Sequence, residues 1–173
     1  MQLDVVRGDI TRESVDAIVN AANRQLAPGG GVCGAIHRAA GRRLAEACAR
    51  LAPCDTGDAV ATRAFDLEPG IRWVIHAVGP VWHGGHDGEA ELLASCYRRI
   101  LEVADEVGAR TVSVPAISTG IYGYPLREAS DVAVDALLAV ADGPGTDVEE
   151  VHLVAFDEDT HRVLEEAVSA RRR

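Results

Sequence analysis

The fold of this chain is constrained most by a regular alternation of short Val- and Ile-rich runs with longer helical patterns. Strand character is found at 3–6, 17–19, 59–65, 72–78, 110–117 and 150–156. Between these runs, apolar residues recur at three- and four-residue spacing, which predicts helices over 34–51, 89–107, 126–141 and 158–170. Strands separated by helices of this length favour a largely parallel sheet that is covered by helices on both faces.

One part of the pattern departs from this rule. The segments 53–70 and 72–80 follow each other without a helix, so part of the sheet is expected to be mixed. The length of 173 residues suits one domain with its own core, and no repeat or linker interrupts it apart from a turn at 143–147. We therefore predict a single α/β domain over residues 1–173. A compact acidic domain of this kind is expected to be a monomer.

The chain contains no lysine, so all seventeen positively charged side chains are arginine. This excludes a P-loop lysine and a lysine Schiff base, and it leaves backbone amides, helix N-termini or arginine to bind any phosphate. The net charge of −10 argues against broad electrostatic binding to nucleic acid. No apolar run is long enough to span a membrane and the N-terminus lacks signal-peptide character, so we expect a cytoplasmic protein.

Neither the cysteines nor the histidines follow a metal-binding pattern. No CxxC pair occurs among Cys33, Cys48, Cys54 and Cys96, and without a secretory context they are expected to be free thiols. His83 and His86 lie in WHGGHDGE, a composition more typical of a polar loop than of a metal site. We predict no metal and no cofactor.

Two glycine-rich loops are suited to binding phosphate. In parallel sheets, ligands bind beyond the carboxyl ends of the strands, where loops lead into helices. The loop GGG (29–31) runs into one predicted helix, and STGIYG (118–123) precedes another. Their backbone amides could hold two linked phosphates from opposite sides. The alternative is that both are only tight strand-to-helix turns, because neither matches a known glycine fingerprint.

Several side chains near these loops have two interpretations. Asp9 is either a helix N-cap or an acceptor for an exocyclic amino group such as that of adenine. Phe156 is either a core residue or a cover for a purine ring. Tyr122 lies between glycines and is expected to be displayed, whereas Asn20 ends an apolar strand and is expected to be a buried structural amide. Asn23, further into the loop, is the better ligand candidate. The residues alone thus predict a nucleotide-diphosphate binder.

A set of motifs along nearly the whole chain resembles the macrodomain family. These are GDIT (8–11), DAIVNAAN (16–23), GGGVCGAIHRAAG (29–41), VIHAVGPVW (74–82), PAISTGIYGYP (115–125) and AFDED (155–159). The sequence is most similar to the branch that contains the MacroD-type hydrolases. The resemblance implies a three-layer α/β/α sandwich around a mixed central sheet, with ADP-ribose as the ligand. It also implies an ADP-ribosyl hydrolase that removes mono-ADP-ribose from acidic side chains of proteins or deacetylates O-acetyl-ADP-ribose.

The resemblance also implies which residues bind the ligand. Asp9, with the Ile10 amide nearby, would bind the adenine amino group, and Phe156 would stack on the adenine ring. Asn23 would contact the distal ribose, and His76 would be a structural core residue. The diphosphate and distal ribose would be held by Gly31, Val32, Ser118, Thr119, Gly120, Ile121 and Tyr122, with Tyr122 close to the sugar.

Cys33 departs from the family pattern. The MacroD-type enzymes have VDG where this chain has VCG, and their aspartate is proposed to activate or orient the attacking water; Pro28 replaces a further glycine-like position. The candidate catalytic residues are therefore Asn23 and Cys33, with water held by Asn23, the loop and the phosphate of the ligand. Cys33 is either a nucleophile at a helix start or a small packing residue, and the only histidine near it in sequence, His37, lies a full helical turn away.

Three functions stay open at this point. The first is the hydrolase, and the second is a non-catalytic reader that binds ADP-ribose or mono-ADP-ribosylated proteins. The third, a module that binds RNA or poly(ADP-ribose), is the least favoured because of the net charge of −10.

Overall fold

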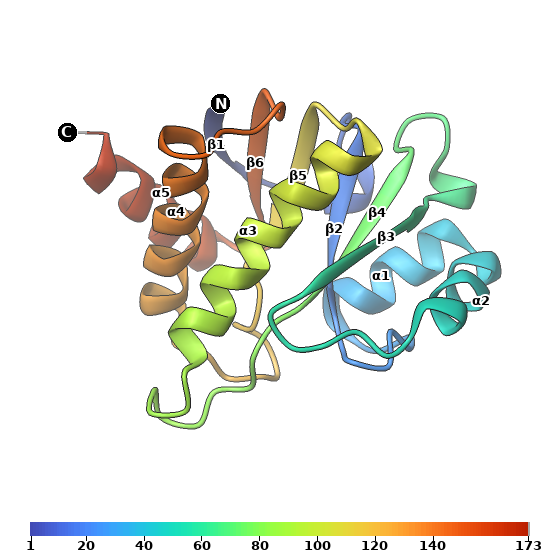
Figure 1. Ribbon diagram of the computed structural model, residues 1–173, viewed down its shortest axis with the longest axis horizontal. Coiled ribbons are helices and arrows are strands. Elements are labelled where there is room, and N and C mark those ends of the chain that lie inside the picture. Colours follow the sequence, from blue (N-terminus) through green and yellow to red (C-terminus); the bar gives the residue numbers. More distant parts are fainter. Residues whose placement is uncertain (173) are drawn as a thin grey trace.

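The computed structural model describes residues 1–172, and within this range the chain folds into a six-stranded sheet and five α-helices (Figure 1). The strands are β1 (Gln2–Arg7), β2 (Ala17–Ala22), β3 (Ala59–Arg63), β4 (Trp73–Val78), β5 (Thr111–Pro115) and β6 (Glu150–Ala155). The helices are α1 (Gly31–Ala40), α2 (Arg42–Leu51), α3 (Glu89–Val107), α4 (Leu126–Asp142) and α5 (Glu158–Arg171). No described helix is both long and apolar enough to cross a membrane.

The strand order is β1-β6-β5-β2-β4-β3, and only the edge strand β3 runs antiparallel to its neighbour. The predicted mixed sheet is therefore confirmed, and its antiparallel part lies where no helix separates two strands. The five parallel strands all end at the same edge of the sheet. The segments that follow β2, β4 and β5 gather at this edge, at the bottom of the view (Figure 1).

Two apolar clusters cover the two faces of the sheet and confirm the three-layer arrangement. Leu93 of α3, Leu137 of α4 and Leu164 of α5 belong to the cluster on one face. Ile36 of α1 and Leu44 of α2 belong to the cluster on the other. All five side chains are essentially inaccessible to solvent. The helical periods seen in the sequence thus mark faces that are buried against a sheet.

The prediction of a single helix over 34–51 is wrong in one respect, because the structure has two helices there. The break is at Gly41, whose φ of 85° favours glycine. A Cβ at this position would also stand 2.3 Å from the Asp66 carboxylate. α1 begins at Gly31, three residues before the predicted start, because the glycine loop runs directly into its first turn.

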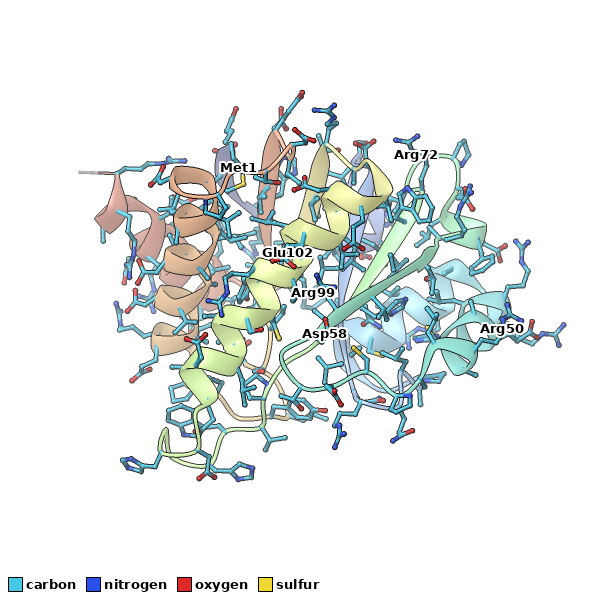
Figure 2. The ribbon with its side chains drawn as sticks, viewed as in Figure 1. Met1, Arg50, Asp58, Arg72, Arg99 and Glu102 are labelled. Carbon is cyan, nitrogen blue, oxygen red and sulfur yellow. The ribbon has the colours of Figure 1, made fainter. Side chains whose placement is uncertain are left out.

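Helix α3 is tied to the antiparallel edge of the sheet by one arginine. Arg99 donates from Nε to Asp58 Oδ1 at 2.8 Å and also bonds to Glu102 on its own helix. Figure 2 shows the three side chains together where α3 passes the start of β3. Partly exposed pairs of this kind add little to stability, so this contact mainly fixes the orientation of the helix.

Candidate ligand-binding site

The residues predicted to bind a ligand come from loops at the carboxyl edge of the sheet. Asp9 follows β1 and Phe156 follows β6, and the two strand ends are joined by the Gly8 N–H, which donates to the Ala155 carbonyl at 2.9 Å. The loop of residues 23–30 follows β2, and the loop of residues 116–125 follows β5. Because β1, β6, β5 and β2 are successive strands in the sheet, the four segments form one continuous rim.

At the β1 end, Asp9 is a helix N-cap, which is one of the two roles predicted for it. Its Oδ1 accepts from the Thr11 amide at 2.9 Å and from the Thr11 hydroxyl at 2.7 Å, which caps a short 3-10 helix over Ile10–Arg12. These bonds, led by that from the hydroxyl, hold the pKa of Asp9 below its usual value. The other oxygen pairs with Arg12 Nε at 4.0 Å and accepts no hydrogen bond from residues 1–172, so a charged acceptor remains available.

Phe156 is displayed and is not a core residue. Its side chain is 84% exposed at the end of β6, whereas the preceding Ala155 is fully buried. An aromatic ring left in solvent beside a charged acceptor is suited to stacking on a flat, partly apolar group. Ile10, its predicted neighbour in the site, points its side chain into the core below α1.

The loop after β2 is closed by Asn23. Its side-chain Nδ2 donates to the Ala27 carbonyl at 3.0 Å, and its Oδ1 accepts from the Ala27 amide at 3.1 Å. An asparagine amide has two donor hydrogens and two acceptor positions on the oxygen, so one of each is left. Asn23 therefore shapes the loop and retains the capacity to bind a further polar group.

The first turn of α1 has open backbone amides. Its N-cap, Gly30, provides no side-chain cap, and Gly31 has a φ of 58°. No heavy atom lies within 4 Å of the positions that a Cβ would take at either glycine. Val32 follows, half-buried against the core cluster of α1. Exposed N–H groups at the positive end of a helix form a site for anions.

Cys33 is the outermost member of a buried series of polar side chains that contact one another. Its Sγ receives a contact from Asn20 Nδ2 at 3.7 Å and is itself 3.7 Å from the Ala27 carbonyl. Asn20 Nδ2 is also 3.1 Å from Nδ1 of His76, whose Nε2 is 3.0 Å from the Thr62 hydroxyl. A proton on Nε2 satisfies both contacts of the ring.

These buried polar side chains have a structural role. Burial, followed by the charge of nearby His37, lowers the pKa of His76 to about 3, so the ring is neutral at physiological pH. The predicted structural roles of Asn20 and His76 are confirmed, since their exposures are 1% and 0%. The two polar contacts of the Cys33 sulfur are with the Asn20 side-chain amide and the Ala27 carbonyl. Neither contact is with a histidine, which favours the interpretation of Cys33 as a packing residue.

The loop after β5 presents small and exposed residues around a strained turn. Ser118 has a φ of 69°, unusual for a residue other than glycine, and its hydroxyl is buried without a hydrogen-bond partner among the described residues. Thr119 donates its hydroxyl to the Ala116 carbonyl at 2.7 Å, and Ile121 is 98% exposed. Tyr122 is half-buried and Gly120 is exposed. The buried hydroxyl leaves one polar group of this rim without a hydrogen-bond partner among the described residues.

Comparisons with known proteins agree with this geometry. The model of the Macro domain family matches residues 19–133. A macro domain-containing protein of Chlorobaculum tepidum is 50% identical, over 97% of this chain and 96% of its own length. A protein of Enterobacter cloacae subsp. cloacae named O-acetyl-ADP-ribose deacetylase is 48% identical, over 98% and 95%. A solved variant of the Oceanobacillus iheyensis macrodomain with ADPR has a TM-score of 0.91 and 39% identity, over 98% and 92%.

The chain belongs to the macro domain family. In this macro domain the predicted ligand residues lie on one rim, in the segments and first helical turns that follow the strands. Among residues 1–172 no group of three or more histidine, cysteine or acidic side chains is arranged to hold a metal. His83 and His86 are exposed, and all four cysteines are buried free thiols.

Two features of this rim were not predicted from the sequence. His37 was expected one turn after Cys33 on α1, but not that its Nε2 is buried with no partner among the described residues; burial lowers its pKa. The four-residue spacing places both side chains on one helix face, but it does not indicate burial of the ring. The second feature is the segment after β4, where the Trp82 amide donates to the Tyr122 carbonyl at 2.8 Å. No motif in the sequence indicates that contact.

Proposed function

We propose that this macro domain binds ADP-ribose and hydrolyses its acyl esters. The substrates would be mono-ADP-ribosylated acidic side chains of proteins, O-acetyl-ADP-ribose, or both. The observation that carries the proposal is a pair of features on neighbouring parts of one rim: the open amides at the first turn of α1 and the loop with the buried, unpaired Ser118 hydroxyl. The name of the Enterobacter cloacae relative and the ADPR in the Oceanobacillus iheyensis structure support it.

We expect the two loops to hold a diphosphate together. The chain has no lysine, so a phosphate must be held by amides, hydroxyls or arginine. The amides of Gly31 and Val32 would bind from one side, where the dipole of α1 favours negative charge. The loop of residues 118–122 would bind from the other side, with the Ser118 hydroxyl gaining the partner that it lacks.

The adenine and the distal ribose would then occupy opposite ends of the rim. Asp9 has a free carboxylate oxygen to accept from the adenine amino group, with the Ile10 amide beside it, and the displayed Phe156 ring would stack on the base. At the other end, Asn23 would use its remaining N–H and lone pair on the ribose hydroxyls. Tyr122 would pack against that sugar.

Hydrolysis needs a water molecule close to the ester. In one form of the proposed reaction the water oxygen bonds to the anomeric carbon of the distal ribose, the anomeric C–O bond breaks, and the acid leaves as a carboxylate. In the other form the water oxygen bonds to the acyl carbon, the acyl C–O bond breaks, and the ribose oxygen leaves and takes up one proton of the water. In both forms one proton of the water passes to a phosphate oxygen of the ligand. Asn23 and the amides of the glycine loop would orient the water, and Cys33, held by Asn20 and Ala27, would shape the space that it occupies.

The test is a hydrolysis time course on an acid-linked, mono-ADP-ribosylated protein and on O-acetyl-ADP-ribose. Wild type and Cys33→Ala are expected to release product, because the thiol is not a nucleophile in this mechanism. Cys33→Asp is expected to be faster if activation of water limits the rate. Loss of all turnover in Cys33→Ala, with ADP-ribose binding intact, would instead indicate covalent catalysis.

A second candidate function is a non-catalytic reader of ADP-ribose. The observation that favours it is that Cys33 contacts only an amide and a carbonyl and stands where the related enzymes are expected to have an aspartate. Tight binding of ADP-ribose by a wild-type protein that hydrolyses neither substrate would establish the reader. Absence of ADP-ribose binding would contradict both candidates.

A further inference from the structure

The segment between β4 and α3, residues 79–88, has a defined shape although it contains no helix or strand. Three of its glycines, Gly84, Gly85 and Gly88, have φ values of 98°, 90° and 75°. The conformation is held by Glu89, the first residue of α3. One carboxylate oxygen of Glu89 accepts from the amides of His83 at 2.9 Å and Gly85 at 2.8 Å. The other accepts from the amide of Asp87 at 2.6 Å.

This use of a glutamate is unusual. Glu89 is only 1% exposed, and among residues 1–172 it forms no ion pair with an arginine or histidine. Its hydrogen bonds, first that from the His83 amide, lower its pKa to about 2, so the carboxylate is charged. A buried charge is tolerated when backbone donors and a helix N-terminus compensate for the lost hydration. The Glu89 side chain therefore stabilises the segment 79–88 and is not part of the exposed face of α3.

The segment held by Glu89 contacts the rim loop of residues 116–125 at two places. At its start, a Cβ on Gly79 would stand 2.2 Å from the Ser118 hydroxyl oxygen, so the Gly79 backbone lies directly against the Ser118 side chain. Further from β4, the Trp82 amide donates to the Tyr122 carbonyl at 2.8 Å, and the Trp82 and Tyr124 rings lie 4.5 Å apart.

The indole of Trp82 is itself fixed by the same segment. A Cβ on Gly85 would stand 2.8 Å from the edge of that indole, so the ring lies directly against the backbone whose amide Glu89 binds. A continuous path of contacts thus runs from Glu89 through Gly85 and Trp82 to Tyr122. Tyr122 is the residue placed next to the distal ribose in the proposed function.

We propose that Glu89 is a positioning residue for the distal half of the site: by fixing the segment 79–88 it holds the loop of residues 118–124 in the ligand-ready conformation. The inference rests on the proposed function for the identity of the ligand. The contact path itself is a property of the ligand-free protein. If the loop is competent for only a tenth of the time, the affinity of any ligand that needs it falls about tenfold.

The experiment compares Glu89→Gln with Glu91→Gln. Both glutamates lie in the first turn of α3, but Glu91 is exposed and bonds only to Arg98 at 2.6 Å. Glutamine cannot accept at all three amides, because one end of its side chain is a donor. Binding is measured by calorimetry with ADP-ribose and with AMP, which lacks the distal ribose. We expect Glu89→Gln to weaken ADP-ribose binding about tenfold and AMP binding less than about twofold, and Glu91→Gln to change neither.

A second readout needs no ligand. Hydrogen exchange is followed in the segment 116–125, where the amides of Gly123 and Tyr124 bond to the carbonyls of Gly120 and Ser118. Exchange there is expected to be about tenfold faster in Glu89→Gln than in Glu91→Gln. If Glu89→Gln does not fold, Glu89→Asp, which keeps the charge but is too short to reach all three amides, replaces it.

The outcomes separate this inference from the proposed function. Unchanged exchange in the 116–125 segment overturns the positioning role, whatever the protein binds. Equal losses for ADP-ribose and AMP also overturn it, because they show damage to the whole domain. If exchange is faster in Glu89→Gln, the positioning role is supported. If the wild type does not bind ADP-ribose, the proposed function is contradicted, whatever the exchange rates are.

Discussion

The two glycine-rich loops of the site differ in how much they depend on other segments. In the loop after β2, Asn23 bonds to both backbone groups of Ala27. The loop of residues 116–125 also has bonds of its own, such as that from the Tyr124 amide to the Ser118 carbonyl, but Gly79 and Trp82 of the segment after β4 pack against it from outside. We therefore expect the shape of the second loop to depend more strongly on a segment distant in the sequence. Substitutions that separate these two kinds of support test the comparison directly.

The largest effect is expected for Gly79→Ala. Its Cβ would meet the Ser118 hydroxyl at 2.2 Å and the Ile117 side chain at 2.5 Å, so the rim loop must move. We expect the free energy of unfolding to fall by about 1–3 kcal/mol, as for other overpacked sites, and ADP-ribose affinity to fall about 100-fold. Urea unfolding and calorimetry measure the two quantities.

The matched control for this change is Gly120→Ala, in the loop itself. No heavy atom lies within 4 Å of the position of its Cβ, so its stability is expected to stay within about 0.5 kcal/mol of wild type. If Gly79→Ala has the same free energy of unfolding as Gly120→Ala, the second loop does not depend on external support.

A smaller effect on binding is expected for Asn23→Ala, which opens the self-closed loop. The change removes both bonds to Ala27 and the proposed contact with the distal ribose. We expect ADP-ribose affinity to fall about tenfold and hydrolysis about 100-fold, with AMP affinity unchanged. Gln25→Ala, an exposed neighbour in the same loop, is the control. A parallel loss of AMP binding would show that this loop supports the adenine end as well.

Phe156→Ala examines a position outside both loops. Because the ring is 84% exposed, its removal is expected to leave stability unchanged within about 0.5 kcal/mol. Loss of one base-stacking contact is expected to weaken ADP-ribose and AMP equally, by about 1 kcal/mol or somewhat more. Leu51→Ala, at an exposed apolar position at the end of α2, is the control. Unequal losses would mean that the ring does not lie on the adenine.

The sequence predicted what depends on local pattern. The strands, the mixed edge and the bounds of α3 follow from periodicity, because the buried face of each element repeats along a short segment. The burial of Asn20 and His76 was predictable for the same reason, since both lie within apolar strands. The clustering of Asp9, Phe156 and the two loops followed from the rule that parallel strands end at one edge.

What the sequence did not predict has no recognisable local pattern. The break at Gly41 is enforced partly by Asp66, which packs where a Cβ would lie. Glu89 has the position of an ordinary first-turn acid, and no known motif indicates that its carboxylate turns back to three amides two to six residues earlier in the chain. Ser118 has its positive φ where Gly79 lies against its side chain. The contacts of Gly41 and Ser118 join segments distant in the sequence, where tertiary packing overrides local preference.

The smallest effect is a difference in how stability depends on pH between the buried residues beneath the two loops. Beneath the first loop lies His76, whose pKa is lowered from 6.5 to about 3 in the folded protein. The unfolded chain therefore binds a proton below pH 6.5 that the folded protein does not bind until about pH 3. Stability is complete above pH 6.5 and falls as the pH decreases, by at most about 1.4 kcal/mol per pH unit.

Beneath the second loop lies Tyr97, whose hydroxyl accepts from the Ile117 amide at 3.3 Å and whose pKa is raised by burial, so it does not titrate in this range. Urea unfolding between pH 5.5 and 7 is expected to show a flatter slope in His76→Gln than in wild type or in the exposed control His83→Gln. Hydrogen exchange near pH 5.5 is expected to quicken in the segment 23–33 before the segment 116–125. Equal slopes in His76→Gln and wild type would mean that the His76 ring is already protonated in the folded protein. The buried residues beneath the two loops would then not differ in their response to pH.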